Sequence, residues 1–249
     1  MIKKDSGWQK MVPHARVIEN DLCGILSKDN KHRIENVLRL REGDSFVITD
    51  GFGHEAKAIL GKNSEYSADK WTAPNREPSL DVTLFAAISK GERLEWVIEK
   101  AVEMGVKHIV PIICERCIVK NPGNTKLERW KKIAATAMIQ CGGCVLPEVM
   151  EPIEYSKMPV PGEETLPILL HEESLTISLK SLPKETKNKK QLWLASGPEG
   201  GFTDEEVNSF IKNNWQPVWL GRRLFKTDTA PIVALSIILS TYWFGNDNI

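Results

Sequence analysis

The chain has no excess of either charge, because 33 lysine and arginine residues balance 33 aspartate and glutamate residues. This balance excludes a basic field over the whole molecule, so a nucleic-acid partner would have to bind a local patch. Basic residues do concentrate in the first segment, at Lys3, Lys4, Lys10, His14, Arg16, Lys28, Lys31, His32, Arg33, Arg39 and Arg41. This segment is either a solvated surface or a site for nucleic acid.

Long apolar segments are also missing. Residues 1–20 contain no apolar run of the kind that forms a secretory signal. The longest apolar stretch, residues 230–244, includes Ser236, Ser240 and Thr241 and is shorter than the ~20 residues that span a bilayer. Five cysteines without a secretory signal are typical of a reducing compartment. We therefore expect a cytoplasmic protein with no membrane partner.

The sequence has no internal repeat, and its 249 residues are enough for one or two domains. Residues 1–72 are typical of a small β-rich unit, in which residues 45–49 and 54–60 predict two strands joined by a turn. Prolines and polar residues at 71–78 predict a linker. The lysine-rich stretch 180–190 predicts an exposed loop.

In the rest of the chain, predicted strands and helices alternate. Strands are expected at residues 80–88, 108–114, 168–170, 192–194 and 217–220. Apolar residues at helical spacing predict helices over residues 94–101, ending at Gly105, and over 130–141. A capping box at 203–206 predicts a helix with the inner face Val207, Phe210 and Ile211. A last helix, apolar on nearly every side, begins at about Asp228 and is expected to be enclosed by protein, in a core or a dimer interface. This alternation predicts an α/β fold with a mostly parallel sheet and helices on both faces.

A glycine-rich loop, Gly197-Pro198-Glu199-Gly200-Gly201, follows one of the predicted strands. Its glycines let the backbone approach a ligand and leave N–H groups free to bind it, while Glu199 adds a carboxylate at the carboxyl end of the strand. The alternative is a tight turn before a capped helix. The spacing matches neither a Walker loop nor a dinucleotide fingerprint, so a phosphate site of those kinds is not predicted.

A second loop follows the predicted strand at 217–220 and contains Gly221, Arg222, Arg223 and Lys226, followed by Thr227, Asp228 and Thr229. Three cations within five residues, beside a buried helix, favour an anionic substrate over a plain surface turn. Asp228 could instead be the N-cap of the last helix. Two such loops near the C-terminus make this region the expected active site.

These motifs, in this order, resemble those of the ribosomal small-subunit methyltransferase E family, the 16S rRNA uridine-N3 methyltransferases of the SPOUT superfamily. The resemblance covers nearly the whole chain from about His32. In the C-terminal part it is carried by Gly197, Pro198, Glu199, Gly200, Gly201, Leu220, Gly221, Arg223, Thr227, Thr229, Ala230, Lys90, Gly91, Glu92, Arg93, Leu94, Glu95, Trp96, Lys100, Glu103, Gly105, Pro111, Glu115, Arg116, Arg129, Trp130, Lys132, Ile133, Gln140, Cys141, Gly142 and Pro147. In the first segment it is carried by His32, Val37, Leu38, Arg39, Asp50 and Gly51.

The resemblance implies an RNA-binding PUA-like β-barrel at residues 1–72 and a SPOUT α/β methyltransferase domain at residues 76–249. That domain is expected to contain a trefoil knot, an exception to the rule that chains do not thread loops. S-adenosylmethionine is the implied cofactor, 16S rRNA of the small ribosomal subunit the implied substrate, and a homodimer the implied assembly. The implied cofactor-binding residues are Leu170, His171, Gly197, Pro198, Glu199, Gly201, Leu220, Gly221, Leu224 and Phe225. The implied RNA-binding residues are His32, Arg39, Lys90 and Arg116.

The expected chemistry assigns roles to four residues. Uracil N3–H is a weak acid that must lose its proton before it attacks a methyl group, so cations are needed where negative charge grows on the uracil oxygens. Arg223, with Lys226 nearby, is the candidate for that task. A proton acceptor is also needed, and Glu199 or Asp228 is the candidate. The methyl donor is already a sulfonium, so no metal is required.

Several positions depart from the family pattern. Gly143 stands where the family usually has arginine, Lys226 replaces an arginine, and Asp228 replaces a glutamate. The family's usual arginine-aromatic start is not recognisable before Val17. Lysine lacks the bidentate geometry of arginine, and aspartate has a shorter reach than glutamate. These changes leave the predicted cofactor pocket intact and leave open a SPOUT methyltransferase with a different RNA target.

Two C-x-x-C pairs, Cys114 with Cys117 and Cys141 with Cys144, resemble a four-thiolate zinc site by spacing alone. The alternative, which we favour, is that they are free cytosolic thiols at the end of a strand and of a helix. The zinc interpretation belongs to a competing function: a non-catalytic, zinc-stabilised RNA-binding factor for ribosome assembly.

Overall fold

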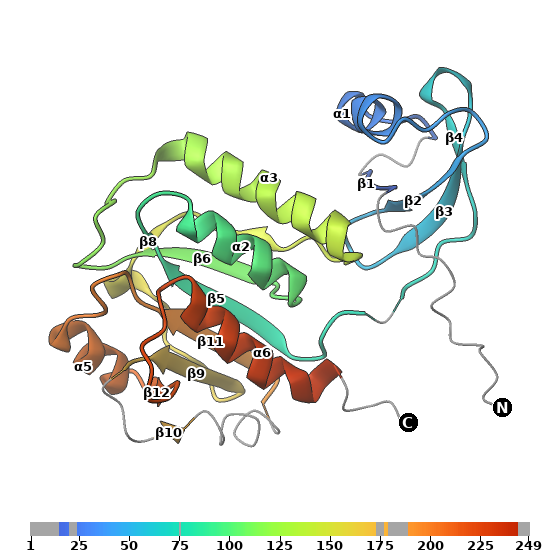
Figure 1. The fold of residues 1–249 in the computed structure, drawn as a ribbon. Coiled ribbons are helices and arrows are strands. Elements are labelled where there is room, and N and C mark those ends of the chain that lie inside the picture. Colours follow the sequence, from blue (N-terminus) through green and yellow to red (C-terminus); the bar gives the residue numbers. More distant parts are fainter. Residues whose placement is uncertain (1–14, 20–23, 75, 173–176, 179–188, 244–249) are drawn as a thin grey trace. The chain divides into compact units, whose positions relative to one another are not determined.

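Figure 1 shows the fold in a computed structural model, which describes residues 15–19, 24–74, 76–172, 177–178 and 189–243. The chain forms two compact units. The first comprises residues 1–76 and 138–145, and the second comprises residues 77–137 and 146–249. The first unit thus includes a segment from the part of the chain that was expected to form the second domain.

Some predictions fall on residues outside this description. Lys3, Lys4, Lys10 and His14 of the basic segment are among them, as is most of the lysine-rich stretch expected to be a loop. Within the described residues, every helix is too short or too polar to cross a bilayer.

The first unit is built on a four-stranded sheet in the order β1-β2-β3-β4. β1 (Arg16–Ile18) pairs in parallel with β2 (Ser45–Thr49), and β2 pairs antiparallel with β3 (Glu55–Leu60), which pairs antiparallel with β4 (Tyr66–Ala68). Alternate side chains of β2 and β3 fill a core with Val17 and Ile34, as the two-residue period of a strand requires. The predicted pair of strands joined by a turn is confirmed. The short helical segments are α1 (Lys28–His32), the π-helical η1 (Arg33–Val37) and the 3-10 segment η2 (Lys62–Ser64).

The second unit contains an eight-stranded sheet in the order β10-β12-β9-β11-β5-β6-β7, with β8 paired to β6. Every pairing in this sheet is parallel. Its strands are β5 (Asp81–Ala87), β6 (His108–Ile113), β7 (Glu148–Val149), β8 (Ile153–Glu154), β9 (Thr165–Leu170), β10 (Ile177–Ser178), β11 (Gln191–Ser196) and β12 (Gln216–Trp219). The central strands are apolar along nearly their whole length because helices and loops cover both of their faces. The predicted α/β fold with a parallel sheet is confirmed, and the trefoil knot stays a prediction.

The helices of the second unit follow the sequence signals closely, with two differences. They are α2 (Arg93–Glu103), α3 (Gly123–Cys141), α5 (Asp204–Lys212) and α6 (Thr229–Trp243), together with the 3-10 segment η3 (Tyr155–Lys157). The last residues of α3, from residue 138, belong to the first unit. α3 begins at Gly123, well before the expected start at residue 130. The capping box of α5 is present, but Ile211 is 47% exposed, so its assignment to the inner face was wrong. A helix turns about 100° per residue, and the buried face of α5 is formed by Glu206, Val207 and Phe210, which leaves Ile211 at the edge of that face.

One apolar cluster packs directly beneath the loop that follows β11. Phe85, Ile112 and Leu169 of the sheet contact Val207 and Phe210 of α5 in this cluster. Phe202, from the loop itself, stacks edge-on against Phe210 with ring centroids 5.1 Å apart. α2 and α6 pack against each other and against β5 and β11 (Figure 1). The loop after β11 is therefore anchored to this apolar cluster of the second unit through Phe202.

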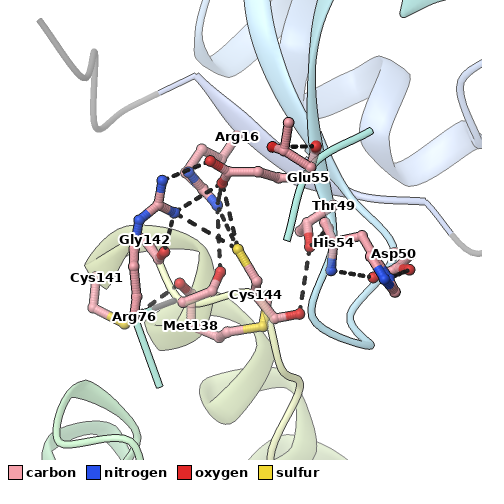
Figure 2. A network of polar contacts seen from close by, with 12 residues as sticks. Arg16, Thr49, Asp50, His54, Glu55, Arg76, Met138, Cys141, Gly142 and Cys144 are labelled. Atoms are coloured by element: carbon pink, nitrogen blue, oxygen red, sulfur yellow. Dashed lines mark hydrogen bonds and ion pairs between the residues drawn. The ribbon is translucent and has the colours of Figure 1, made fainter. Parts of the chain in front are cut away.

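A partly buried ion network holds the segment 138–145 in the first unit (Figure 2). The Glu55 carboxylate accepts hydrogen bonds from Arg16 at 2.6 Å and from both terminal nitrogens of Arg76 at 2.6 and 2.8 Å. Arg76 also donates to Gly142 O at 2.9 Å, and the Cys144 thiol lies 3.4 Å from Glu55 Oε2. Burial alone would raise the pKa of Glu55, but the hydrogen bonds and positive charges of Arg76 and Arg16 outweigh it and lower the pKa to about 2.

Replacing Glu55 with glutamine is expected to destabilise the first unit by about 2–4 kcal/mol, because it removes the carboxylate charge that both Arg16 and Arg76 contact. Since the pKa of Glu55 in the folded protein is about 2 and its ordinary value is 4.5, the stabilisation is complete above pH 4.5 and is lost as the pH falls towards 2. Urea unfolding at several pH values checks this prediction. The exposed Glu42→Gln is the control, and an equal loss of stability in both variants would contradict it.

Candidate functional site

A cavity of about 530 Å³ opens at the carboxyl ends of the neighbouring parallel strands β9, β11 and β12. Loops from the ends of parallel strands meet at one edge of a sheet, which is where α/β folds place their ligand sites. The residues that line the cavity are Arg93, Arg116, Leu170, His171, Glu172, Ser196, Gly197, Pro198, Glu199, Gly200, Gly201, Phe202, Asp204, Val218, Trp219, Leu220, Gly221, Arg223, Leu224, Phe225, Lys226, Thr227 and Ala230. The cavity belongs entirely to the second unit.

The loop after β11 is held in place by its own turn and by a hydroxyl from the second loop. Gly201 N donates to Pro198 O at 2.9 Å, and Gly201 has a φ of +69°, a conformation that favours glycine. Thr227 Oγ1 donates to Gly197 O at 2.5 Å. A Cβ atom at Gly197 would lie 3.1 Å from the Phe202 ring, so glycine allows the loop to close on that ring. The glycines of this loop therefore allow the backbone conformation that forms one wall of the cavity.

The carboxylate of Glu199 links this loop to the residues that follow β5. Its Oε1 atom accepts hydrogen bonds from Lys90 N and from Arg93 Nη1, each at 3.0 Å. Both contacts cross from β11 to β5, which are adjacent strands of the sheet. One oxygen of Glu199 is thus engaged by the protein itself.

Cations and carboxylates share the wall of the cavity. Arg93, Arg116, Arg223 and Lys226 supply the positive charge, and Glu172, Glu199 and Asp204 supply the negative charge. The apolar part comes from side chains such as Leu170, Leu224 and Phe225, of which Leu224 is 78% exposed and Phe225 is 40% exposed. A wall of this kind suits a ligand that carries both charges and an apolar or aromatic part.

The structure brings most of the predicted site residues together. All ten residues expected to bind the cofactor line the cavity, and so do Arg223, Lys226 and Glu199 from the catalytic set. Asp228 is not among the lining residues. It immediately precedes α6, and its Oδ1 accepts a hydrogen bond from Thr229 Oγ1 at 3.0 Å.

The four residues expected to bind RNA are divided between the units. Arg116 lines the cavity, and Lys90 reaches Glu199 through its backbone N–H. His32 and Arg39 belong to the first unit, where both are exposed. Their roles in RNA binding stay predictions.

The site residues missing from the sequence prediction include Arg93, Ser196 and Trp219. Ser196 and Trp219 are the last residues of β11 and β12, so the strand boundaries could have indicated them. Arg93 begins α2 and reaches the cavity because β5 lies next to β11. That adjacency is a property of the sheet order, for which the sequence carries no local signal.

The two C-x-x-C pairs fall in different units. Cys114 and Cys117 are buried in the apolar cluster of the second unit, where Cys114 N donates to Cys117 Sγ at 3.3 Å. Burial raises the pKa of Cys144 to about 11, and the neighbouring Glu55 carboxylate adds to this increase. In the described part of the chain, no group of three or more His, Cys, Asp or Glu side chains could hold a metal ion.

Comparisons with known proteins match both units. The family model of an RNA methyltransferase domain matches residues 75–239, and that of an RNA methyltransferase PUA domain matches residues 27–66. The ribosomal RNA small subunit methyltransferase E of Synechocystis sp. is 36% identical over 211 residues, covering 83% of this chain and 69% of that protein. The protein of the same name from Bacillus subtilis is 31% identical over 229 residues, covering 86% of this chain and 88% of that protein.

Two solved structures are similar over nearly the whole chain. A methyltransferase from Legionella pneumophila in complex with the bound cofactor SAM has a TM-score of 0.82 at 30% identity, covering 91% of this chain and 97% of that chain. A ribosomal RNA small subunit methyltransferase E from Neisseria gonorrhoeae bound to S-adenosyl methionine has a TM-score of 0.80 at 29% identity, covering 92% of this chain and 98% of that chain.

The purified protein is expected to contain far less than one zinc ion per chain. A structural zinc ion needs about four ligands, and no group of even three His, Cys, Asp or Glu side chains among the described residues could hold a metal ion. Elemental analysis by mass spectrometry after dialysis against zinc checks the content, and thermal unfolding with and without EDTA checks for a structural metal. Stoichiometric zinc whose removal lowers the unfolding temperature would contradict the prediction.

Proposed function

Because the chain belongs to the ribosomal RNA small subunit methyltransferase E family of RNA methyltransferases, we propose that it transfers a methyl group from S-adenosylmethionine to N3 of a uridine in 16S rRNA. The observation that carries this proposal is the gathering of all ten predicted cofactor-binding residues around one cavity. The cavity volume of about 530 Å³ is within the range of small-molecule sites. Two similar structures contain this cofactor, which supports the assignment.

The loops after β9, β11 and β12 would hold the cofactor, mainly through backbone groups and apolar contacts. When bound, S-adenosylmethionine supplies an electrophilic methyl group on a sulfonium. The cavity wall is suited to this ligand, because carboxylates such as Glu172 and Glu199 can meet its positive charges and the Leu170 and Phe225 side chains can contact its adenine.

Arg223 and Lys226 are the residues proposed to stabilise the uracil anion. Both line the cavity, and both belong to the loop after β12. Negative charge grows on the uracil oxygens as the N3 proton leaves, and a cation placed beside those oxygens lowers the energy of the transition state. Positioning of the base beside the methyl donor supplies a further part of the rate.

Glu199 is the better placed of the two proposed proton acceptors. It lines the cavity, whereas Asp228 does not. Its Oε1 atom is engaged by Lys90 and Arg93, which orients the carboxylate and leaves the acceptor role to Oε2. A carboxylate held in one orientation is what general-base catalysis requires.

The first unit is proposed to bind the RNA, since it matches an RNA methyltransferase PUA domain. His32 and Arg39 are the candidate contacts there. We also propose that the protein acts as a homodimer. The departures at Gly143, Lys226 and Asp228 favour, as a second candidate, methylation of a different RNA target by the same chemistry.

Incubation with methyl-labelled S-adenosylmethionine and either small ribosomal subunits or free 16S rRNA is expected to transfer label to RNA. Reverse transcription is expected to stop at the modified nucleotide, because a methyl group on N3 blocks Watson–Crick pairing. Cofactor binding without transfer would instead support the non-catalytic assembly factor. Label without a stop would contradict the N3 assignment.

Replacing Arg223 with alanine is expected to lower kcat by about 10²–10³-fold, the usual effect of removing one group that stabilises an oxyanion. Arg222→Ala is the matched control, because Arg222 is an adjacent exposed arginine that is not among the lining residues. Initial rates at saturating cofactor and RNA give the comparison. Equal losses in the two variants would mean that only the charge of the loop matters.

A further inference from the structure

Glu206 is a fully buried carboxylate in the first turn of α5, with no measurable exposure. Its Oε2 atom accepts a hydrogen bond from Thr203 N at 2.9 Å, while Thr203 Oγ1 accepts one from Glu206 N at 3.2 Å. These reciprocal bonds form the capping box that starts the helix. Thr203 directly follows the loop that lines the cavity, so the capping box fixes one end of that loop.

The other oxygen of Glu206 reaches a distant part of the chain. Its Oε1 atom accepts a hydrogen bond from Glu115 N at 2.7 Å, in the turn that follows β6. Cys117 N donates to Cys114 O at 3.1 Å and closes this turn. A capping box needs only one carboxylate oxygen. The bond from Glu115 N to the other oxygen is therefore not part of the cap, and it connects α5 to the turn after β6.

The same turn holds the cavity loop through a second side chain. Arg116 Nη1 donates to Gly200 O at 2.7 Å and to Phe202 O at 3.3 Å. A Cβ atom at Gly200 would lie 3.3 Å from Arg116 Cδ, so the loop packs closely along the arginine stem. The turn at residues 114–117 and the loop at residues 200–203 are therefore joined at two points, by Arg116 and by Glu206.

Burying a carboxylate is costly unless hydrogen bonds compensate for the lost hydration. At Glu206 the compensation comes from two backbone N–H groups and from the positive end of the α5 dipole. Truncation of such a group would remove the acceptor of the buried Thr203 N–H group and of the partly buried Glu115 N–H group. The carboxylate thus fixes, together with Arg116, the distance between the turn at residues 114–117 and the loop at residues 200–203.

We propose that Glu206 is a positioning residue for cofactor binding, which acts by fixing the cavity loop to the turn after β6. This inference rests on the proposed function, in which the cavity binds S-adenosylmethionine. A loop that is already in its bound conformation loses less conformational entropy when the ligand binds. Glu206 does not line the cavity, so it acts through Thr203, Glu115 and Arg116.

Two pairs of variants separate this role from capping and from general stability. Glu206→Gln replaces one acceptor oxygen with an amide group, and Glu205→Gln is its control because Glu205 is an exposed carboxylate in the same turn.

Glu115→Pro removes the backbone donor and leaves the capping box intact. Glu115→Ala is its control, because it removes the same exposed side chain and keeps the N–H group. Proline is favoured at the second position of a turn, which residue 115 occupies.

The full-length variants are compared by calorimetry with S-adenosylmethionine and by initial rates. Glu206→Gln and Glu115→Pro are expected to raise the cofactor Kd and KM by about 10–100-fold, the range for a lost hydrogen bond to a charged group, with kcat at saturating cofactor changed by less than about threefold. Hydrogen exchange in the cofactor-free protein is expected to speed up at residues 200–203 in both. The two controls are expected to match the wild type in all three measurements.

Folded Glu115→Pro protein with wild-type Kd and wild-type exchange at residues 200–203 would overturn the proposal, whatever happens to Glu206→Gln. A loss of kcat with an unchanged cofactor KM would also overturn it. Wild-type protein that binds no S-adenosylmethionine would instead refute the proposed function, and this inference with it. Wild-type binding together with unchanged variants refutes the positioning role alone.

Discussion

Parallel pairing of β9, β11 and β12 is the constraint on which the candidate site depends. Parallel strands require long crossover connections, so the residues that follow adjacent strands come from distant parts of the sequence. Leu170, Gly197 and Leu220 nevertheless line one cavity, because each follows or ends a strand at the same edge of the sheet. The register of the three strands therefore sets which backbone groups can reach a shared ligand.

The cavity loop is shaped from outside as well as by its own glycines. Thr227 binds Gly197 O, and Arg116 binds Gly200 O and Phe202 O. Phe202 anchors the loop to the apolar cluster by stacking on Phe210. Contacts of this kind occupy backbone oxygens that would otherwise need water or ligand. A loop restrained in this way reaches the geometry needed for binding before a ligand arrives.

Local signals in the sequence predicted most of the helices and strands. The order of the strands in the sheet, and the side chains that this order brings together, depend on contacts between distant residues. The capping box at Thr203 and the apolar strands were readable because each signal lies within a few residues. Arg93 was missed because its place in the cavity depends on the order of β5 and β11 in the sheet. The two-residue strands β7 and β8 are too short to show any periodicity.

The position of the segment 138–145 was also not predicted from the sequence, because it depends on contacts between distant residues. Its place in the first unit rests on contacts among Arg16, Glu55, Arg76 and Gly142, which lie far apart in the chain. The residues of this network were visible in the sequence as ordinary charged side chains. Only the folded structure shows that one glutamate joins two arginines. The residues of the cavity were easier to predict than this network, because the motifs of the cavity loops resemble those of a known family.

Two carboxylates, Glu55 and Glu206, perform the same physical task in the two units by different means. Each joins segments that are distant in sequence, and each is largely removed from water. Two arginines balance Glu55, so its contribution depends on charge and is lost in acid. Backbone N–H groups and the positive end of the α5 dipole balance Glu206, so this carboxylate has no counter-charge from a side chain in its hydrogen bonds.

Exposed ion pairs, such as Arg129 with Glu92, contribute far less, because water screens them. The basic and acidic residues are equal in number, but they contribute unequally to the stability of the fold. In the described part of the chain most charged side chains are exposed or partly exposed to solvent, while Glu55 and Glu206 fix the positions of segments that the backbone alone would leave independent. Because a buried carboxylate must find its donors to be tolerated at all, each one selects a single arrangement of the segments around it.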